Sequence, residues 1–219
     1  MTLTFLQAIN AVLRRLREDP VASSNSTDYS KLIGDFVNQA MYDCEHAWDW
    51  NCLQEVITIT TAAGDNLYDF HNADVKIIEV INETKRWVMR PIENKLDHRF
   101  EYLDDPVNDS PYYYSFRGLN GDYSQVKIFP TPTGVESLRF LTVKYTRNKD
   151  VDGTDDSEII SVPWQPVVLS AYAQAISERG EDGGISYNEA DSHARSALAD
   201  AISLDMSLNH PLQNQWYAY

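Results

Sequence analysis

Apolar residues at helical spacing mark the first fifty residues. Thr4 and Gln7 have the spacing of a capping box, which predicts the beginning of a helix. The apolar stripe of that helix consists of Leu6, Ile9, Leu13 and Leu16. Asp19-Pro20 ends it, since proline cannot continue a helix. A second helix is predicted from about Asp28 to Trp50, packed antiparallel against the first.

Short runs of β-branched and aromatic residues follow, from about residue 53 to 147. Asn120-Gly121 lies between two such runs and is a strong hairpin signal. A short helix is expected near residues 93–102. The predicted strands cover residues 56–61, 75–81, 87–89, 112–116, 125–129 and 138–145. About six strands in so short a region predict a small antiparallel sandwich or a partly open barrel.

Helical spacing returns after residue 159. Pro163 and Pro166 lie where a helix begins, and a glycine-containing stretch from Gly180 to Gly184 ends it. Ser186 and Glu189 form a second capping box. The stripe of this last helix is predicted to be Ala190, Ala194, Leu198, Ile202 and Met206.

The predicted fold class is therefore α+β. Helices from both parts of the chain form one bundle, with the β domain inserted between them. The predicted boundaries are 1–52 for the N-terminal helices, 53–158 for the β domain, 159–208 for the C-terminal helices and 209–219 for an extended segment.

The net charge of the chain bears on whether the protein binds nucleic acid. The 219 residues carry 33 acidic and 18 basic side chains, a formal net charge of -15. Recognition of nucleic acid needs clustered Lys and Arg, so this balance disfavours a nucleic-acid reader. It suits a protein past which DNA moves without sticking, and ordinary solubility explains it equally well. No run approaches eighteen apolar residues, so no membrane contact is expected, and the first helix is amphipathic rather than a signal peptide.

No catalytic constellation is recognisable. The sequence has no phosphate-binding glycine loop and no nucleophile elbow, and its five histidines are scattered. Cys44 and His46 lie two apart on a predicted helix, which separates their side chains, and Cys44 and Cys52 are expected to be reduced, buried thiols. We expect no enzyme activity and no cofactor.

One acidic stretch resembles a cation loop. Asn148, Asp150, Asp152 and Gly153 match the first, third, fifth and sixth positions of a calcium loop. Glu158 lies one position short of the final ligand, where Ile159 stands. Two interpretations stay open: a solvated acidic loop between domains, or a calcium-assisted β domain that holds a ligand or glycan through its tyrosines.

Residues 209–219 differ from the rest of this acidic chain. They contain no Asp, Glu, Lys or Arg, and they carry several large apolar side chains. The candidate anchor residues are Pro211, Leu212, Trp216, Tyr217 and Tyr219. Aromatic groups gain stability by leaving water, so this segment either packs onto its own domain or binds a groove on a partner.

A family resemblance favours the partner. The order of motifs is informative: Trp48-Asp-Trp50, then Ile128-Phe-Pro-Thr-Pro132, Val162-Pro-Trp-Gln-Pro166, Ala171–Ala175, Glu178–Asp182 and Ala197–Ile202. In this order and spacing the chain resembles the head-to-tail adaptor proteins of tailed bacteriophages, the group that includes tail tubular protein A.

The resemblance implies a structural role in the virion, at the head–tail junction, for a protein made in the bacterial host cytoplasm. It implies a homo-oligomeric ring of twelve copies beneath the phage portal protein, joined on its other side to the downstream tail or nozzle protein. The ring would continue the DNA channel without sequence-specific binding. It also implies that the segment 209–219 is the piece that embeds in the portal.

Overall fold

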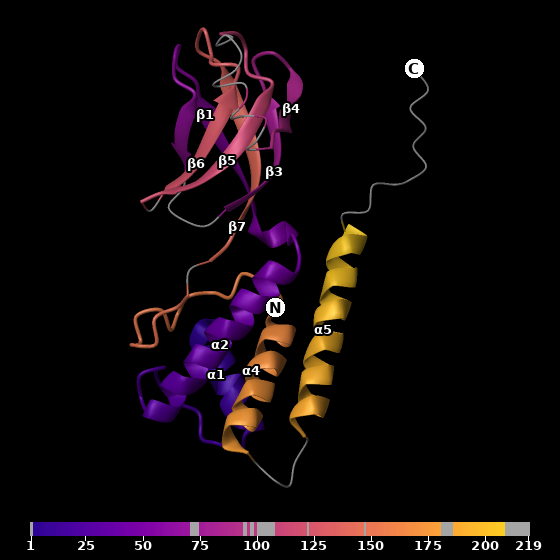
Figure 1. The fold of residues 1–219 in the computed structure, drawn as a ribbon. Coiled ribbons are helices and arrows are strands. Elements are labelled where there is room, and N and C mark those ends of the chain that lie inside the picture. Colours follow the sequence, from indigo (N-terminus) through magenta and orange to yellow (C-terminus); the bar gives the residue numbers. More distant parts are fainter. Residues whose placement is uncertain are drawn as a thin grey trace. The chain divides into compact units, whose positions relative to one another are not determined.

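The chain forms two compact units of an α+β protein. The computed structural model describes residues 2–70, 75–93, 96, 99, 108–121, 123–146, 148–180 and 186–208, with only the backbone of Phe70, Leu119 and Asn120. Residues 1–53 and 146–219 make up the helical unit, and residues 54–145 make up the sheet unit. The described residues contain four α-helices and one seven-stranded sheet, which confirms the predicted class (Figure 1).

Helix α1 (Phe5–Arg15) begins with the predicted capping box. The Gln7 backbone N–H donates to Thr4 Oγ1 at 3.3 Å, and the Thr4 N–H donates to Gln7 Oε1 at 3.1 Å. These bonds satisfy two of the backbone donors that a helix start otherwise leaves without partners.

Helix α2 (Asp28–Ala47) stops three residues before its predicted end. Trp48 has an extended backbone, with φ −155° and ψ 154°, so the helix ends before the two tryptophans. A 3₁₀ turn (Asn51–Leu53) then leads into the sheet unit.

Helices α4 (Trp164–Arg179) and α5 (Tyr187–Leu208) follow the sheet unit in sequence. Gly180 ends α4 in the left-handed conformation, at φ 61°, which glycine adopts without steric penalty. Helix α4 packs against α1, α2 and α5. The predicted stripe of α5 is only partly correct: Ala190 and Ala194 are buried, Leu198 and Ile202 are half-buried, and Met206 is exposed.

The sheet unit is a single curled sheet of order β1-β7-β3-β4-β5-β6-β2. Its strands are β1 (Gln54–Thr60), β2 (Leu67–Phe70), β3 (Val75–Asn82), β4 (Trp87–Pro91), β5 (Tyr113–Asn120), β6 (Tyr123–Phe129) and β7 (Ser137–Lys144). The buried core of the sheet consists of Val75, Val80, Met89, Tyr114, Val126, Ile128, Leu138 and Phe140. The sheet resembles half of a barrel, and it is not a two-layered sandwich.

Strand prediction succeeded where the pairing is local. The β5–β6 hairpin turns at the predicted Asn120-Gly121, and β4 pairs antiparallel with β3 as expected. Strand β2 was not predicted, and β4 pairs with β5 in parallel rather than antiparallel. The short helix expected near residues 93–102 falls mostly outside the described residues.

Two side chains of α2 hold the segment that returns from the sheet unit. Asn38 Nδ2 donates to the Lys149 carbonyl at 2.8 Å, and the Lys149 N–H donates to Asn38 Oδ1 at 2.9 Å. Seven residues along the same helix, Glu45 accepts hydrogen bonds from the backbone N–H and the hydroxyl of Thr146. Both α2 side chains are buried. They therefore supply the hydrogen bonds that an irregular segment cannot make with itself.

The acidic loop after Lys149 packs on the beginning of α1. The Phe5 N–H donates to the Glu158 carbonyl at 2.8 Å, and the Leu6 N–H donates to the Asp156 carbonyl at 3.2 Å. Residues 146–158, which were predicted to belong to the β domain, thus lie in the helical unit.

The amide pair at Asn38 gives a test of this attachment. We expect Asn38→Ala to lower the free energy of unfolding by about 1–3 kcal/mol, because it leaves two partly buried backbone groups of Lys149 without their side-chain partners. In a chain of this size each kcal/mol lowers Tm by about 2–4 °C. Urea denaturation followed by far-UV circular dichroism measures the change.

The matched control is the next residue of α2. Gln39→Ala removes only an exposed bond to Asp43 and should change the unfolding free energy by less than about 0.5 kcal/mol. Equal losses from the two variants would show that the Asn38 bonds do not hold the returning segment.

Glu45 gives a pH-dependent prediction. Burial raises the pKa of its carboxyl above 4.5, while the Thr146 hydrogen bonds, His46 and Lys149 act in the opposite direction. A raised pKa in the folded state means that the contribution of Glu45 to stability is complete below about pH 4.5 and is lost as the pH rises through the folded-state value.

Glu45→Gln cannot ionise and keeps an acceptor for the Thr146 N–H. We expect the unfolding free energy of this variant, minus that of the unchanged protein, to be larger at pH 8 than at pH 4. Urea denaturation at both pH values measures this difference. Asn38→Ala does not remove a titrating group, so its difference should be the same at the two values. A constant difference for Glu45→Gln would contradict the assignment.

Candidate partner-binding groove

The described part of the helical unit contains a groove of about 400 Å³ that is lined mainly by apolar side chains. Three segments form it: the residues after α2, the first turn of α4 and the last turns of α5. We call it the α4–α5 groove. Its principal apolar residues are Trp50, Pro163, Trp164, Ala201, Leu204 and Leu208, and its polar residues include Cys52, Asp200 and Asp205.

Asp205 ties the last turn of α5 to the segment after α2. Its Oδ2 accepts from Trp48 Nε1 at 3.1 Å and from the Asn51 N–H at 3.4 Å. The neighbouring Trp50 is 1% exposed, and its Nε1 donates to the Cys44 carbonyl at 2.7 Å. The two tryptophans that end the α2 region are therefore held in place by hydrogen bonds, and Trp50 forms a rigid part of the groove.

Prolines shape the α4 side of the groove. Pro163 precedes the helix, and Pro166 occupies its first turn, where the missing N–H has no intrahelical acceptor in any case. The helix therefore begins sharply at Trp164, whose side chain is half-buried at the groove.

The α5 side of the groove is open. Beyond the buried Ala190 and Ala194, apolar side chains of α5 remain in contact with water. Leu204 is 65% exposed and Leu208 is 76% exposed. Burial of either side chain under another apolar surface would be favourable, because it would remove apolar area from water.

Comparison with known protein families identifies the family of this chain. The model of the SU10 adaptor protein family matches residues 3–213. The chain belongs to the SU10 adaptor protein family. This is a family of phage head-to-tail adaptors, so the bacteriophage resemblance is confirmed at that level, while likeness to tail tubular protein A stays a prediction. A comparison with curated proteins gives no match.

The predicted anchor residues of this SU10 adaptor family member, Pro211, Leu212, Trp216, Tyr217 and Tyr219, lie outside the described residues. The groove was not predicted from the sequence. Its signals in the sequence are the Trp48-Asp-Trp50 and Val162–Pro166 motifs, which by themselves indicated only the family. Recognition of the groove needed the contact between those motifs and the last turns of α5.

The candidate cation loop uses its acids as hydrogen-bond acceptors. Asp155 accepts from the Asp150 N–H at 2.7 Å, and Asp156 accepts from the Ser24 N–H at 3.2 Å. Asp152 accepts from the N–H and hydroxyl of Thr154, which lower the pKa of its carboxyl. Among the described residues, no group of three or more His, Cys, Asp and Glu side chains is arranged to hold a metal ion.

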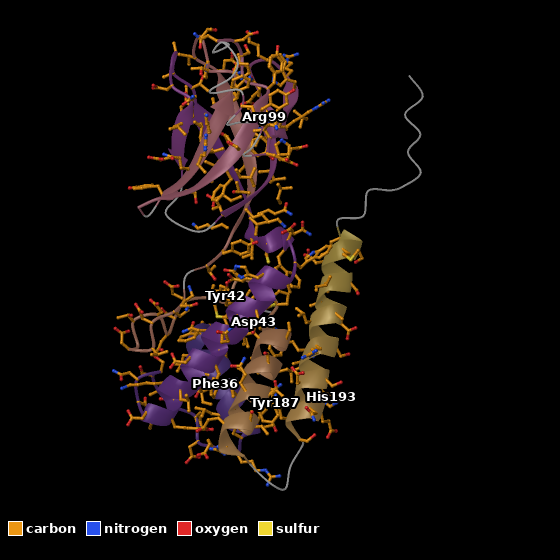
Figure 2. All side chains as sticks on the ribbon, in the orientation of Figure 1. Phe36, Tyr42, Asp43, Arg99, Tyr187 and His193 are labelled. Carbon is orange, nitrogen blue, oxygen red and sulfur yellow. The ribbon has the colours of Figure 1, made fainter. Side chains whose placement is uncertain are left out.

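Tyr42, His46 and His193 are not among the residues that line the groove. The rings of Tyr42 and His46 lie on the exposed side of α2 with their centroids 4.0 Å apart and their planes tilted by 30°, while His193 belongs to α5 (Figure 2). In the part of the chain that the structure describes, no helix is both long enough and apolar enough to cross a bilayer.

The two cysteines have different surroundings. Cys44 is buried on α2, where burial and then the neighbouring Glu45 raise the pKa of its thiol to about 12. Cys52 lines the groove and is exposed, which corrects the expectation that both thiols are buried. Partial burial, followed by the charge of Asp205, raises the pKa of the Cys52 thiol as well.

This contrast predicts selective alkylation. At pH 8 we expect iodoacetamide to modify one thiol per folded chain, at Cys52, because reaction needs an accessible thiolate. Mass spectrometry after a timed quench measures the modification. In urea both thiols should react, and Cys52→Ser should leave the folded chain unmodified. Modification of Cys44 under native conditions would contradict the burial described above.

Proposed function

We propose that this protein is a structural adaptor of a tailed bacteriophage and that it forms a ring between the portal protein and the tail. The family resemblance implies twelve copies in this ring. The observation that carries the proposal is the family match over residues 3–213. Membership of a structural adaptor family also favours a role without enzyme activity. The virion would contain the protein at the head–tail junction.

We assign the portal contact to residues 209–219, with Pro211, Leu212, Trp216, Tyr217 and Tyr219 as the anchor. The absence of charge from this segment and its aromatic content support the assignment. Burial of a large apolar side chain contributes about 1.5–3 kcal/mol before ordering costs are subtracted. A modest affinity per copy becomes a durable joint once many copies engage one portal ring together.

Ring closure needs heterologous contacts, in which different surfaces of neighbouring copies meet. Both units present large apolar side chains to water, for instance Val56 and Val88 on the sheet and Tyr42 and Leu204 on the helices. These side chains are candidates for contacts between copies.

The acidic charge fits a DNA channel. The helical unit contains 19 acidic and 8 basic residues, so most of the net negative charge belongs to it. Negative charge along a lumen repels the phosphate backbone, which would let DNA move through without binding.

The alternative function, a calcium-assisted ligand-binding module, predicts that calcium raises Tm. The acids of residues 148–158 already accept hydrogen bonds from the protein, which does not favour that alternative.

Mass photometry with the portal ring of the same genome tests the proposal. We expect a discrete mass increase of about twelve copies of the 25.0 kDa chain when the full-length protein is added. A chain that ends at Leu208 should give no increase, because it lacks the proposed anchor.

Paired substitutions provide the control. Trp216→Ala with Tyr217→Ala should weaken loading strongly, whereas Gln213→Ala with Gln215→Ala changes the same segment without removing an aromatic anchor and should load normally. Normal loading of the chain ending at Leu208 would refute the anchor assignment alone. No loading of any form at several salt concentrations would refute the adaptor role.

A further inference from the structure

The α4–α5 groove lacks a covering element among the described residues. Helix α5 is 22 residues long, and within this described helix only Ala190 and Ala194 are buried. A second, smaller hollow of about 160 Å³ is lined by residues of α2, α4 and α5, among them Leu198. An apolar surface so incompletely covered can bind another segment.

The lining of the groove determines which segment fits. Trp164, Leu204 and Leu208 offer apolar contact, while Asp200 and Asp205 add negative charge. Asp205 already accepts two hydrogen bonds, and Asp200 is exposed. An acidic segment would be repelled, whereas an uncharged segment with aromatic side chains and amide donors satisfies both parts of the lining.

Residues 209–219 have this composition and are attached at the groove. They follow Leu208, which is itself part of the lining. They contain Trp216, Tyr217 and Tyr219, together with the side-chain amides of Asn209, Gln213, Asn214 and Gln215. Eleven residues reach at most about 40 Å when extended, so these side chains are within reach of the groove. A short tether gives them an effective concentration in the millimolar range.

We propose that, before the portal is met, residues 209–219 occupy the α4–α5 groove of their own chain. The inference rests on the proposed function in one respect: the segment that covers the groove is the one assigned to the portal. Binding to the portal then requires release of the segment from the groove. The groove acts as a storage site that keeps an uncharged aromatic segment out of water and away from other copies.

Cys52 reports directly on the groove, because it is part of the lining and is accessible. We would measure the rate of its alkylation by iodoacetamide in the full-length protein and in the chain ending at Leu208. At an effective concentration of about 1 mM and a Kd of about 0.1 mM, the segment would fill the groove most of the time. Removal of the segment should therefore speed alkylation of Cys52 about ten-fold.

Cys44 checks the fold in the same sample. Because it is buried and the pKa of its thiol is about 12, it stays unmodified as long as α2 remains packed. A variant in which both thiols react has lost its fold and is replaced by the paired substitutions. Trp216→Ala with Tyr217→Ala should speed alkylation as removal of the segment does, and Gln213→Ala with Gln215→Ala should have a smaller effect.

Three further outcomes decide the proposal. A synthetic peptide of residues 209–219 should slow alkylation of the chain ending at Leu208 in a saturable manner. Equal Cys52 rates in the full-length and shortened chains would overturn the proposal. Protection that increases with protein concentration would show that the segment of a second copy fills the groove, which would overturn the assignment to the same chain.

The alkylation measurement uses no portal, so it separates the two proposals. Protection of Cys52 together with normal portal loading of the shortened chain would refute only the portal anchor. Equal Cys52 rates together with anchor-dependent loading would refute only the storage of the segment in the groove.

Discussion

The pairing of β1 with β7 is the constraint on which the two-unit arrangement depends. Gln54 lies opposite Val143, so the chain enters and leaves the sheet unit at neighbouring positions. Residues 1–53 and 146–208 can therefore form one helical unit although more than ninety residues separate them in sequence. Asn38 and Glu45 then bind the returning chain at Lys149 and Thr146, and the following loop supplies carbonyls to the beginning of α1. Helices α4 and α5 come next along the chain, after this attached segment.

Buried carboxylates hold irregular segments in both units. Glu45 does so for Thr146 in the helical unit. In the sheet unit, Glu136 is 5% exposed and accepts hydrogen bonds from Asn82 Nδ2 and Ser110 Oγ. Its backbone also exchanges hydrogen bonds with Thr61. A buried acid is expensive unless its oxygens are hydrogen-bonded. Both oxygens of Glu45 accept from Thr146, and those of Glu136 accept from Asn82 and Ser110. These acids thus join residues that are distant in the sequence: Glu45 of α2 binds Thr146, and Glu136 binds Asn82 of β3 and Ser110.

The sequence predicted the features that arise from neighbouring residues. The Thr4–Gln7 capping box, the turn at Asn120-Gly121 and the stop at Gly180 each depend on a few adjacent positions. The errors arose where distant residues decide. Strand β2 is too short to give a pattern, and the parallel β4–β5 pair joins residues more than twenty positions apart. The outer half of α5 was predicted to be buried because its apolar spacing is regular, but the helix packs on one side only. The groove combines Trp50, Trp164 and Leu204, and no local pattern brings such residues together.

The two proposals place opposite demands on the affinity of residues 209–219 for the groove. Storage needs this affinity to be high, and binding to the portal needs it to be low enough for release. If the groove holds residues 209–219 about nine-tenths of the time, the apparent affinity of one copy for the portal falls about ten-fold, because only the released fraction can bind. A single copy then attaches weakly. In the proposed ring, copies that engage the same portal together would gain affinity by factors that can exceed a hundred, which would keep the ring on the portal. A groove of about 400 Å³, which is small and open at α5, suits this balance better than a deep cavity would. In the proposed scheme it would hold the segment against water and still release it when neighbouring copies bind the portal together.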